Sequence, residues 1–147
     1  MQHSRRDLAM LLAALGASKA WAQKAAAKPA FPKLPSKVYH SRQIPFEGDD
    51  KKKGRQFFDG AEHAGFHLEF HETTLGPGTQ THDPHRHVHD EIVILVEGTL
   101  EALIEKRTEV AETGSVIYFA SNQLHSVRNV GKTPCTYYVI ELRGAEA

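Results

Sequence analysis

Four histidines and an adjacent acid pair lie within ten residues of the sequence, from His82 to Glu91. Imidazole and carboxylate groups at this density bind metal ions or transfer protons. In an extended chain alternate side chains share one face, which places His85, His87, His89 and Glu91 on the same side. Two imidazoles in a His-x-His arrangement suit chelation of a single ion, and a nearby carboxylate can complete one face of its coordination sphere. The segment therefore predicts a metal site.

An apolar run follows directly, over residues 92–96, and is typical of a buried strand. Val93 and Leu95 share the parity of Glu91, so we expect them to point into the same interior. By the same alternation Phe119 and Val127 face that interior from later strands. These four residues are the predicted pocket lining, and a register slip of one residue would invert the set.

Short strands with regular turn signals are expected along the rest of the chain. Their predicted ranges are 38–46, 56–59, 66–75, 91–96, 99–105, 107–111, 116–119, 125–130 and 135–142. No convincing helical periodicity follows residue 22. This pattern predicts an all-β sandwich or barrel. Within residues 66–75, His67 and His71 alternate with apolar side chains, and we interpret them as polar-face residues of a half-buried strand.

Two motifs then resemble the signatures of the cupin superfamily, whose members are small jelly-roll β-barrels. Residues 78–98 are similar to the first signature, with a spacer before the histidines that is one residue longer than usual. Residues 114–129 are similar to the second, with Ala120 in place of the usual proline and Asn122 in place of the usual glycine. The matching residues are Gly78, His85, His87, Glu91 and Gly98 in the first motif and Gly114, His125 and Asn129 in the second.

The resemblance implies a single jelly-roll β-barrel, the cupin double-stranded β-helix, with a core over residues 66–142 of a domain spanning 38–147. It also implies that His85, His87, Glu91 and His125 hold one divalent ion. Imidazole and carboxylate ligands accept Fe, Mn, Zn, Ni or Cu, so the ion stays open. His82 and His89 lie outside the family pattern. Each is either an exposed loop histidine or a group that hydrogen-bonds the site or its substrate.

The composition excludes several classes of protein. The formal net charge is zero, which argues against nucleic-acid binding. The single cysteine, Cys135, excludes an intrachain disulfide and a cysteine-based zinc knuckle, and it is interpreted as a packing residue. The Lys51-Lys52-Lys53 run is interpreted as a solvated turn.

The first 22 residues are typical of a secretory signal peptide. A charged opening precedes ten apolar residues and a small-x-small cleavage site at Ala20-Trp21-Ala22. Arg5 and Arg6 after a serine resemble a twin-arginine signal; a general-secretion signal and an uncleaved anchor are the alternatives. Residues 23–37, rich in Ala, Lys and Pro, are expected to form a linker. The mature protein is thus predicted to be periplasmic or secreted, without a membrane segment.

Three functions of different class fit a site of three imidazoles and one carboxylate. The first is a metal-dependent enzyme, either a dioxygenase-like oxidoreductase or an isomerase or decarboxylase acting on a small molecule. The second is a binding or sensing module without turnover, and the third is a structural metal barrel. Because an open β-sandwich has edges to cover, a homodimer is also expected.

Overall fold

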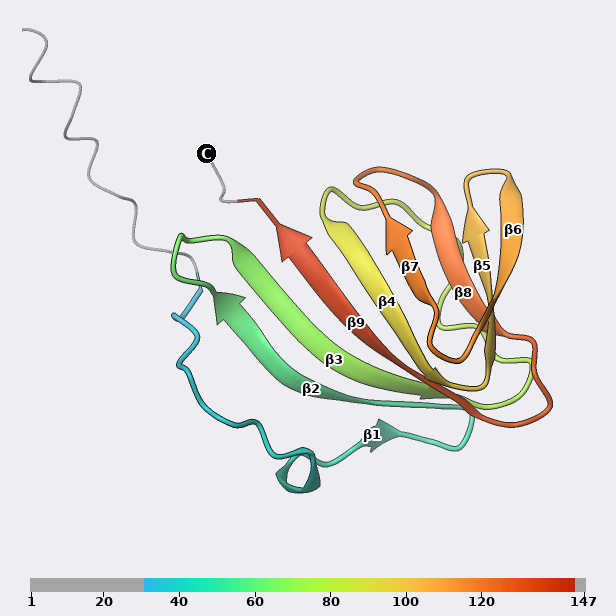
Figure 1. The fold of residues 1–147 in the computed structure, drawn as a ribbon, viewed down its shortest axis with the longest axis horizontal. Coiled ribbons are helices and arrows are strands. Elements are labelled where there is room, and N and C mark those ends of the chain that lie inside the picture. The colour runs from blue at the N-terminus through green and yellow to red at the C-terminus, as the bar shows by residue number, and fades with distance from the viewer. Residues whose placement is uncertain (1–30, 145–147) are drawn as a thin grey trace, which may run out of the picture.

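The computed structural model describes residues 31–144, which form two antiparallel sheets that share one core (Figure 1). The larger sheet has the order β1-β2-β3-β9-β4-β7, and the smaller one has the order β6-β5-β8. The strand bounds are β1 Glu47–Gly48, β2 Lys52–Ala61, β3 His67–Leu75, β4 Asp90–Glu97, β5 Thr99–Ile104, β6 Arg107–Glu112, β7 Val116–Phe119, β8 His125–Asn129 and β9 Cys135–Arg143. The predicted all-β, jelly-roll class is confirmed.

The predicted strand over residues 56–59 lies within β2, but two predictions for the segment before it were wrong. In place of a strand over residues 38–46 the chain forms a short 3₁₀ helix, η1, at Ser41–Gln43. In place of the solvated turn expected at Lys51-Lys52-Lys53, β2 begins at Lys52. The carboxylate of Asp49 accepts the backbone N–H groups of Lys51 and Lys52 at 2.8 and 3.0 Å. This bond pattern closes a tight turn between β1 and β2, so a charged segment that reads as a loop enters the sheet.

The expected signal peptide, residues 1–22, and residues 23–30 of the expected linker lie outside the described residues. At Pro32 and Leu34 the chain already contacts the larger sheet. Pro32 accepts the backbone N–H of Ala61 at 2.9 Å, and Leu34 donates to the carbonyl of Ala61 at 2.9 Å. Within residues 31–144, no helix has both the length and the apolar character that crossing a bilayer requires.

The core lies between the inner faces of the two sheets. Its buried members are Leu75, Val93, Leu95, Leu100, Ala102, Ile117, Phe119, Val127, Cys135, Tyr137 and Val139. Val93, Leu95, Phe119 and Val127, which alternation directed inward, are each at most 5% exposed. Tyr118 and Arg128, their opposite-parity neighbours, are exposed.

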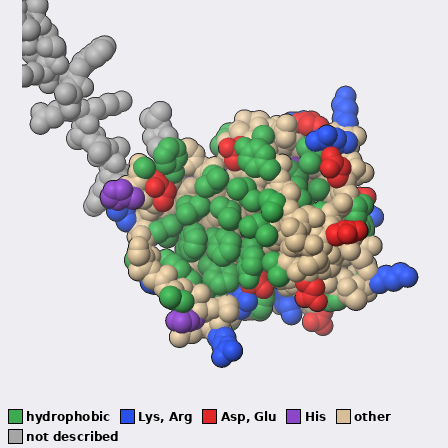
Figure 2. Space-filling model, in the orientation of Figure 1, with side chains coloured by type: hydrophobic (Ala, Val, Ile, Leu, Met, Phe, Trp, Pro, Cys, Tyr) green, Lys and Arg blue, Asp and Glu red, His purple; other side chains and the backbone are tan. Residues whose placement is uncertain are grey.

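The outer face of the larger sheet is apolar. Four aromatic side chains from β2, β3 and β9 pack there with ring centroids 5.1–6.2 Å apart; they are Phe57, Phe58, Phe70 and Tyr138. Figure 2 shows a broad hydrophobic surface over β3, β9 and β4. Val116 and Tyr118 of the neighbouring β7 add side chains that are 65% and 55% exposed.

Candidate metal centre

Two segments far apart in the sequence meet at the site. His85 and His87 lie in the loop before β4, Glu91 is the second residue of β4, and His125 opens β8. The backbone N–H of His85 donates to the carbonyl of His125 at 3.1 Å, and the reverse bond is 3.0 Å long. A pair of backbone hydrogen bonds therefore joins the loop before β4 to the smaller sheet, directly at the two histidines.

The two rings of His87 and His125 are held in the same manner. Nδ1 of His87 donates to the carbonyl of His89 at 2.9 Å, and Nδ1 of His125 donates to the carbonyl of Gln123 at 2.9 Å. Because a carbonyl can only accept, each Nδ1 carries the proton and each Nε2 presents a lone pair. Both Nε2 atoms are buried without a hydrogen-bond partner. Carbonyls that set the tautomer in this way are typical partners of metal-ligating histidines.

Glu91 and His85 complete the cluster. The Oε2 atom of Glu91 lies 3.4 Å from Nε2 of His87 and 3.9 Å from Nε2 of His125. The ring of His85 lies 5.1 Å from that of His87 and 4.6 Å from that of His125, between centroids. Nδ1 of His85 is also buried without a partner. One nitrogen from each of the three rings falls within 4.8 Å of the others.

The charges of these groups suit a divalent cation. Burial lowers the pKa of His85, and the neighbouring histidines lower it further, so this imidazole favours its neutral form. Burial alone would raise the pKa of Glu91, but the nearby imidazole of His125, with help from His87, lowers it overall. Burial alone would lower the pKa of His125, yet the nearby carboxylate of Glu91 raises it.

Buried polar atoms without partners are rare in proteins and call for an explanation. Three such nitrogens beside one carboxylate form a donor set that fits Zn, Fe, Mn, Ni or Cu. The residues present therefore fit the ion that the sequence predicts.

His89 lies inside the structure, against the cluster. It is 9% exposed, and its ring stacks on His87 with centroids 3.5 Å apart and planes 6° from parallel. Its Nε2 lies 3.0 Å from Oε2 of Glu141, which Arg143 also contacts at 2.9 Å. His87, His89 and Glu91 form a second close group. However, the lone-pair axes of two parallel stacked rings do not meet, so His87 and His89 cannot both point at one ion.

His82 is placed differently. It is exposed, its ring meets that of His85 edge-on at 4.1 Å, and its Nδ1 lies 3.2 Å from the carbonyl of Asp83. The two histidines outside the family pattern thus have separate environments, one packed beneath the cluster and one at its exposed edge.

The cluster opens onto a cavity of about 240 Å³ between the two sheets. Hydroxyl side chains line much of it: Thr73, Thr81, Ser126 and Tyr137. Phe119 and Val127, two of the predicted lining residues, are in its wall. Val93 and Leu95 are not; they lie farther along β4, where the core is packed solid, and both are at most 1% exposed.

Sequence reasoning missed Lys52 and His71 as lining residues of this cavity. In the register of β2 with β3, Lys52 lies opposite Leu75 and Gln56 lies opposite His71. His71 shares the parity of Thr73 and Leu75, whose side chains are buried on the inner face. Its place in the same alternation as Leu75 could have predicted that His71 faces the cavity. The position of Lys52 could be predicted only from the pairing of β2 with β3.

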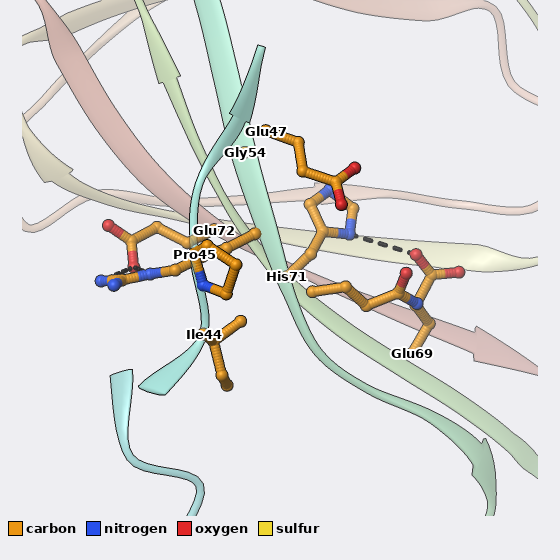
Figure 3. Close-up of a pocket in the computed structure, with 9 residues that line it drawn as sticks. Ile44, Pro45, Glu47, Gly54, Glu69, His71 and Glu72 are labelled. Carbon is orange, nitrogen blue, oxygen red and sulfur yellow. Dashed lines mark hydrogen bonds and ion pairs between the residues drawn. The ribbon is translucent and has the colours of Figure 1, made fainter. Parts of the chain in front are cut away.

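His71 also lines a second pocket, of about 490 Å³, beside β1 and β2 (Figure 3). Its Nδ1 lies 3.3 Å from Oε1 of Glu69. In Figure 3 the side chains of Glu47 and Glu69 both extend toward this imidazole. The close contact with His71 lowers the pKa of Glu69, so the pair favours an ionised carboxylate beside the ring.

Two motif residues act on the backbone and hold no ligand position. Asn129 is fully buried; its amide donates to the carbonyls of Leu75 and Thr133 at 2.9 and 2.8 Å and accepts the N–H of Gly131 at 2.8 Å. Gly98 has φ +92°, and a Cβ there would lie 2.5 Å from that of Cys135. Both residues hold together the ends of strands that carry the site.

Comparisons with known proteins agree with the fold. Residues 71–141 match the family model described as cupin domain, Cupin_2. An RmlC-like cupin from Shewanella frigidimarina superposes with a TM-score of 0.62 at 16% identity, covering 76% of this chain and 95% of that one. No match was found among curated proteins.

Two further solved structures share the fold. KdgF from Halomonas sp. superposes with a TM-score of 0.63 at 13% identity, covering 74% of this chain and 95% of that one. A predicted oxalate decarboxylase from Thermotoga maritima superposes with a TM-score of 0.61 at 19% identity, covering 74% of this chain and 100% of that one. At these identities the likeness concerns the fold alone.

Proposed function

We propose that the protein is a metal-dependent enzyme of the dioxygenase type that acts on a small molecule, because residues 71–141 match the cupin-domain model and three histidines and Glu91 converge beside a cavity. His85, His87, Glu91 and His125 would hold the ion. When bound, the ion would polarise a substrate oxygen and, if redox-active, activate dioxygen.

The observation that carries the proposal is the shared cavity. His85, Glu91 and His125 line the same space as Thr81 and Tyr137, whose hydroxyls lie 2.9 Å apart. A purely structural metal site is closed by its ligands, whereas a catalytic one faces a space that a substrate can enter. The hydroxyl groups can orient a substrate oxygen, and the buried wall around Phe119 limits access of water.

Isomerisation or decarboxylation is the second candidate, and His71 favours it. Both reactions require proton transfer to or from the substrate. His71 lines the cavity, and Glu69 lies 3.3 Å from its Nδ1, so the far nitrogen of the ring can exchange a proton with a bound molecule. His71→Gln would abolish such proton transfer and leave metal content unchanged.

The test has two stages. Elemental analysis of protein purified from its native export route should find about one divalent ion per chain. Oxygen uptake should then be screened with catechol and dicarbonyl substrates, with His85→Ala/His87→Ala as the inactive control. Metal-loaded protein that binds these compounds without oxygen uptake or other turnover would support the binding module instead. Protein that never retains metal would contradict the proposal.

A further inference from the structure

Among residues 31–144, Lys52 is the only lysine or arginine that lines the cavity. It is the first residue of β2, and its register opposite Leu75 places it on the inner face of the larger sheet. The turn closed by Asp49 fixes its backbone, since Asp49 accepts the N–H of Lys52 and donates its own N–H to the carbonyl of Lys52 at 2.9 Å. The side chain of Lys52 therefore leaves a defined point at the cavity wall.

The ammonium group of Lys52 has hydrogen-bonding capacity to spare. Its Nζ donates to the carbonyl of Thr81 at 2.9 Å, so the side chain crosses from β2 to the segment that flanks β8. Among residues 31–144, no carboxylate lies within 4.0 Å of this atom. Because an ammonium has three donors and Thr81 uses one, two remain for a bound molecule.

The acids of the cavity wall are already engaged elsewhere. Glu91 lies against His87 and His125. Glu141 lies 3.0 Å from His89 and 2.9 Å from Arg143. Neither of these acids pairs with Lys52, and an occupied metal site would add positive charge to the same space.

The surroundings of Lys52 also suit an oxygen-rich group. Thr81, which anchors the ammonium, shares a hydrogen bond of 2.9 Å with the hydroxyl of Tyr137, and Thr73 is buried beside them. The cavity volume of about 240 Å³ is below the range of about 300–1,000 Å³ typical of drug-sized ligands, so the cavity has room only for a smaller molecule.

We propose that the cavity takes a small molecule with an anionic oxygen group, carboxylate or phosphate, which Lys52 binds while another oxygen of the same molecule faces the histidine cluster. This inference rests on the proposed function insofar as both concern one cavity. It revises the interpretation of the Lys51-Lys52-Lys53 run as solvated throughout: its middle residue is the anion-binding one.

The experiment is calorimetric titration of zinc-loaded protein with succinate, with inorganic phosphate and with the neutral analogue succinamide. Lys52→Gln is the test variant. Lys53→Gln is the matched control, because Nζ of Lys53 lies 5.4 Å from the Phe46 ring centroid and the residue does not line the cavity. Since Lys52 is exposed, the melting temperature of Lys52→Gln should be close to that of the wild type. An unchanged melting temperature separates a binding defect from misfolding.

We expect wild type and Lys53→Gln to bind one of the two anions, succinamide to bind far more weakly, and Lys52→Gln to lose roughly ten-fold to a hundred-fold in affinity. Preference for succinate identifies a carboxylate site, and preference for phosphate a phosphate site. Equal affinity of Lys52→Gln and wild type, or no binding of either anion, overturns the proposal. Zinc content is measured in the same samples: protein without zinc contradicts the metal-dependent function, and its anion titration still decides the role of Lys52.

Discussion

His87 and His89 stack in parallel, with 3.5 Å between their ring centroids, and the carbonyl of His89 accepts the Nδ1 proton of His87. His89 therefore orients a candidate ligand through both its ring and its backbone. We expect His89→Ala to weaken metal affinity about ten-fold to a hundred-fold, because the ring of His87 loses its packing partner. Competition with a chromogenic chelator measures the change.

His89→Phe separates the two contacts of the His89 side chain. Phenylalanine preserves the stacking on His87 but cannot interact with Glu141, whose Oε2 lies 3.0 Å from Nε2 of His89. Near-wild-type affinity in His89→Phe assigns the effect to stacking. Wild-type affinity in His89→Ala would show that the ring of His89 does not position His87.

Removal of two ligand histidines should abolish metal binding. The double variant His85→Ala/His87→Ala leaves Glu91 and His125 as the only candidate ligands, which is too few for a stable site. We expect no metal by elemental analysis and a lower melting temperature than that of the metal-loaded wild type, since a bound ion stabilises only the folded state. His63→Ala, at an exposed position, is the control. Full metal content in the double variant would refute the assignment.

Gly98 and Gly114 allow a matched test of two backbone constraints. Both have φ near +90°, but a Cβ at Gly98 would collide with Cys135, whereas at Gly114 nothing lies within 4 Å. Gly114→Ala bears only the strain of a left-handed residue, about 1–2 kcal/mol. Gly98→Ala adds overpacking of about 1–3 kcal/mol. Urea denaturation measures the free energy of unfolding of both variants. Equal losses of this free energy would argue against the close approach of Cys135 to Gly98.

The export route remains a prediction on residues outside the described part of the chain. If Arg5 and Arg6 form a twin-arginine signal, the variant Arg5→Lys/Arg6→Lys should remain in the cytoplasm. Immunoblots of periplasmic and cytoplasmic fractions measure this. Unchanged export would favour the general-secretion route.

The homodimer also remains a prediction, and the apolar outer face of the larger sheet offers a surface for it. An isologous contact buries the same patch on both copies. We expect Tyr118→Lys, on that face, to shift sedimentation toward monomer, and Val110→Lys, which is 63% exposed on β6 of the other sheet, to leave it unchanged. A wild type that sediments as monomer at all concentrations tested would contradict the expectation.

Alternation along the sequence was informative wherever the chain is regular. It directed Val93 and Leu95 into the core, and Phe119 and Val127 into the interior. It was less reliable just before β4, because the strand begins only at Asp90 and the three histidines ahead of it lie in a loop. The burial of His89 therefore depends on loop geometry, which no simple period describes.

The far wall of the cavity depends on long-range pairing. Lys52 faces it only because β2 pairs with β3 through a register that includes an irregularity between Gln56 and Phe58. Thr81 faces it because its segment lies against β8, where its N–H reaches the carbonyl of Val127 at 3.4 Å. Such contacts join residues about 20 to 50 positions apart and leave no local signal.

The reciprocal backbone bonds between His85 and His125 have a mechanical consequence. These bonds join two of the candidate ligands directly. A displacement of the loop before β4 must therefore either move both histidines together or first break the two hydrogen bonds. The spacing between these two ligands is thus kept when the opening of the cavity changes shape. A molecule can therefore enter past the exposed His82 without moving the two ligands apart.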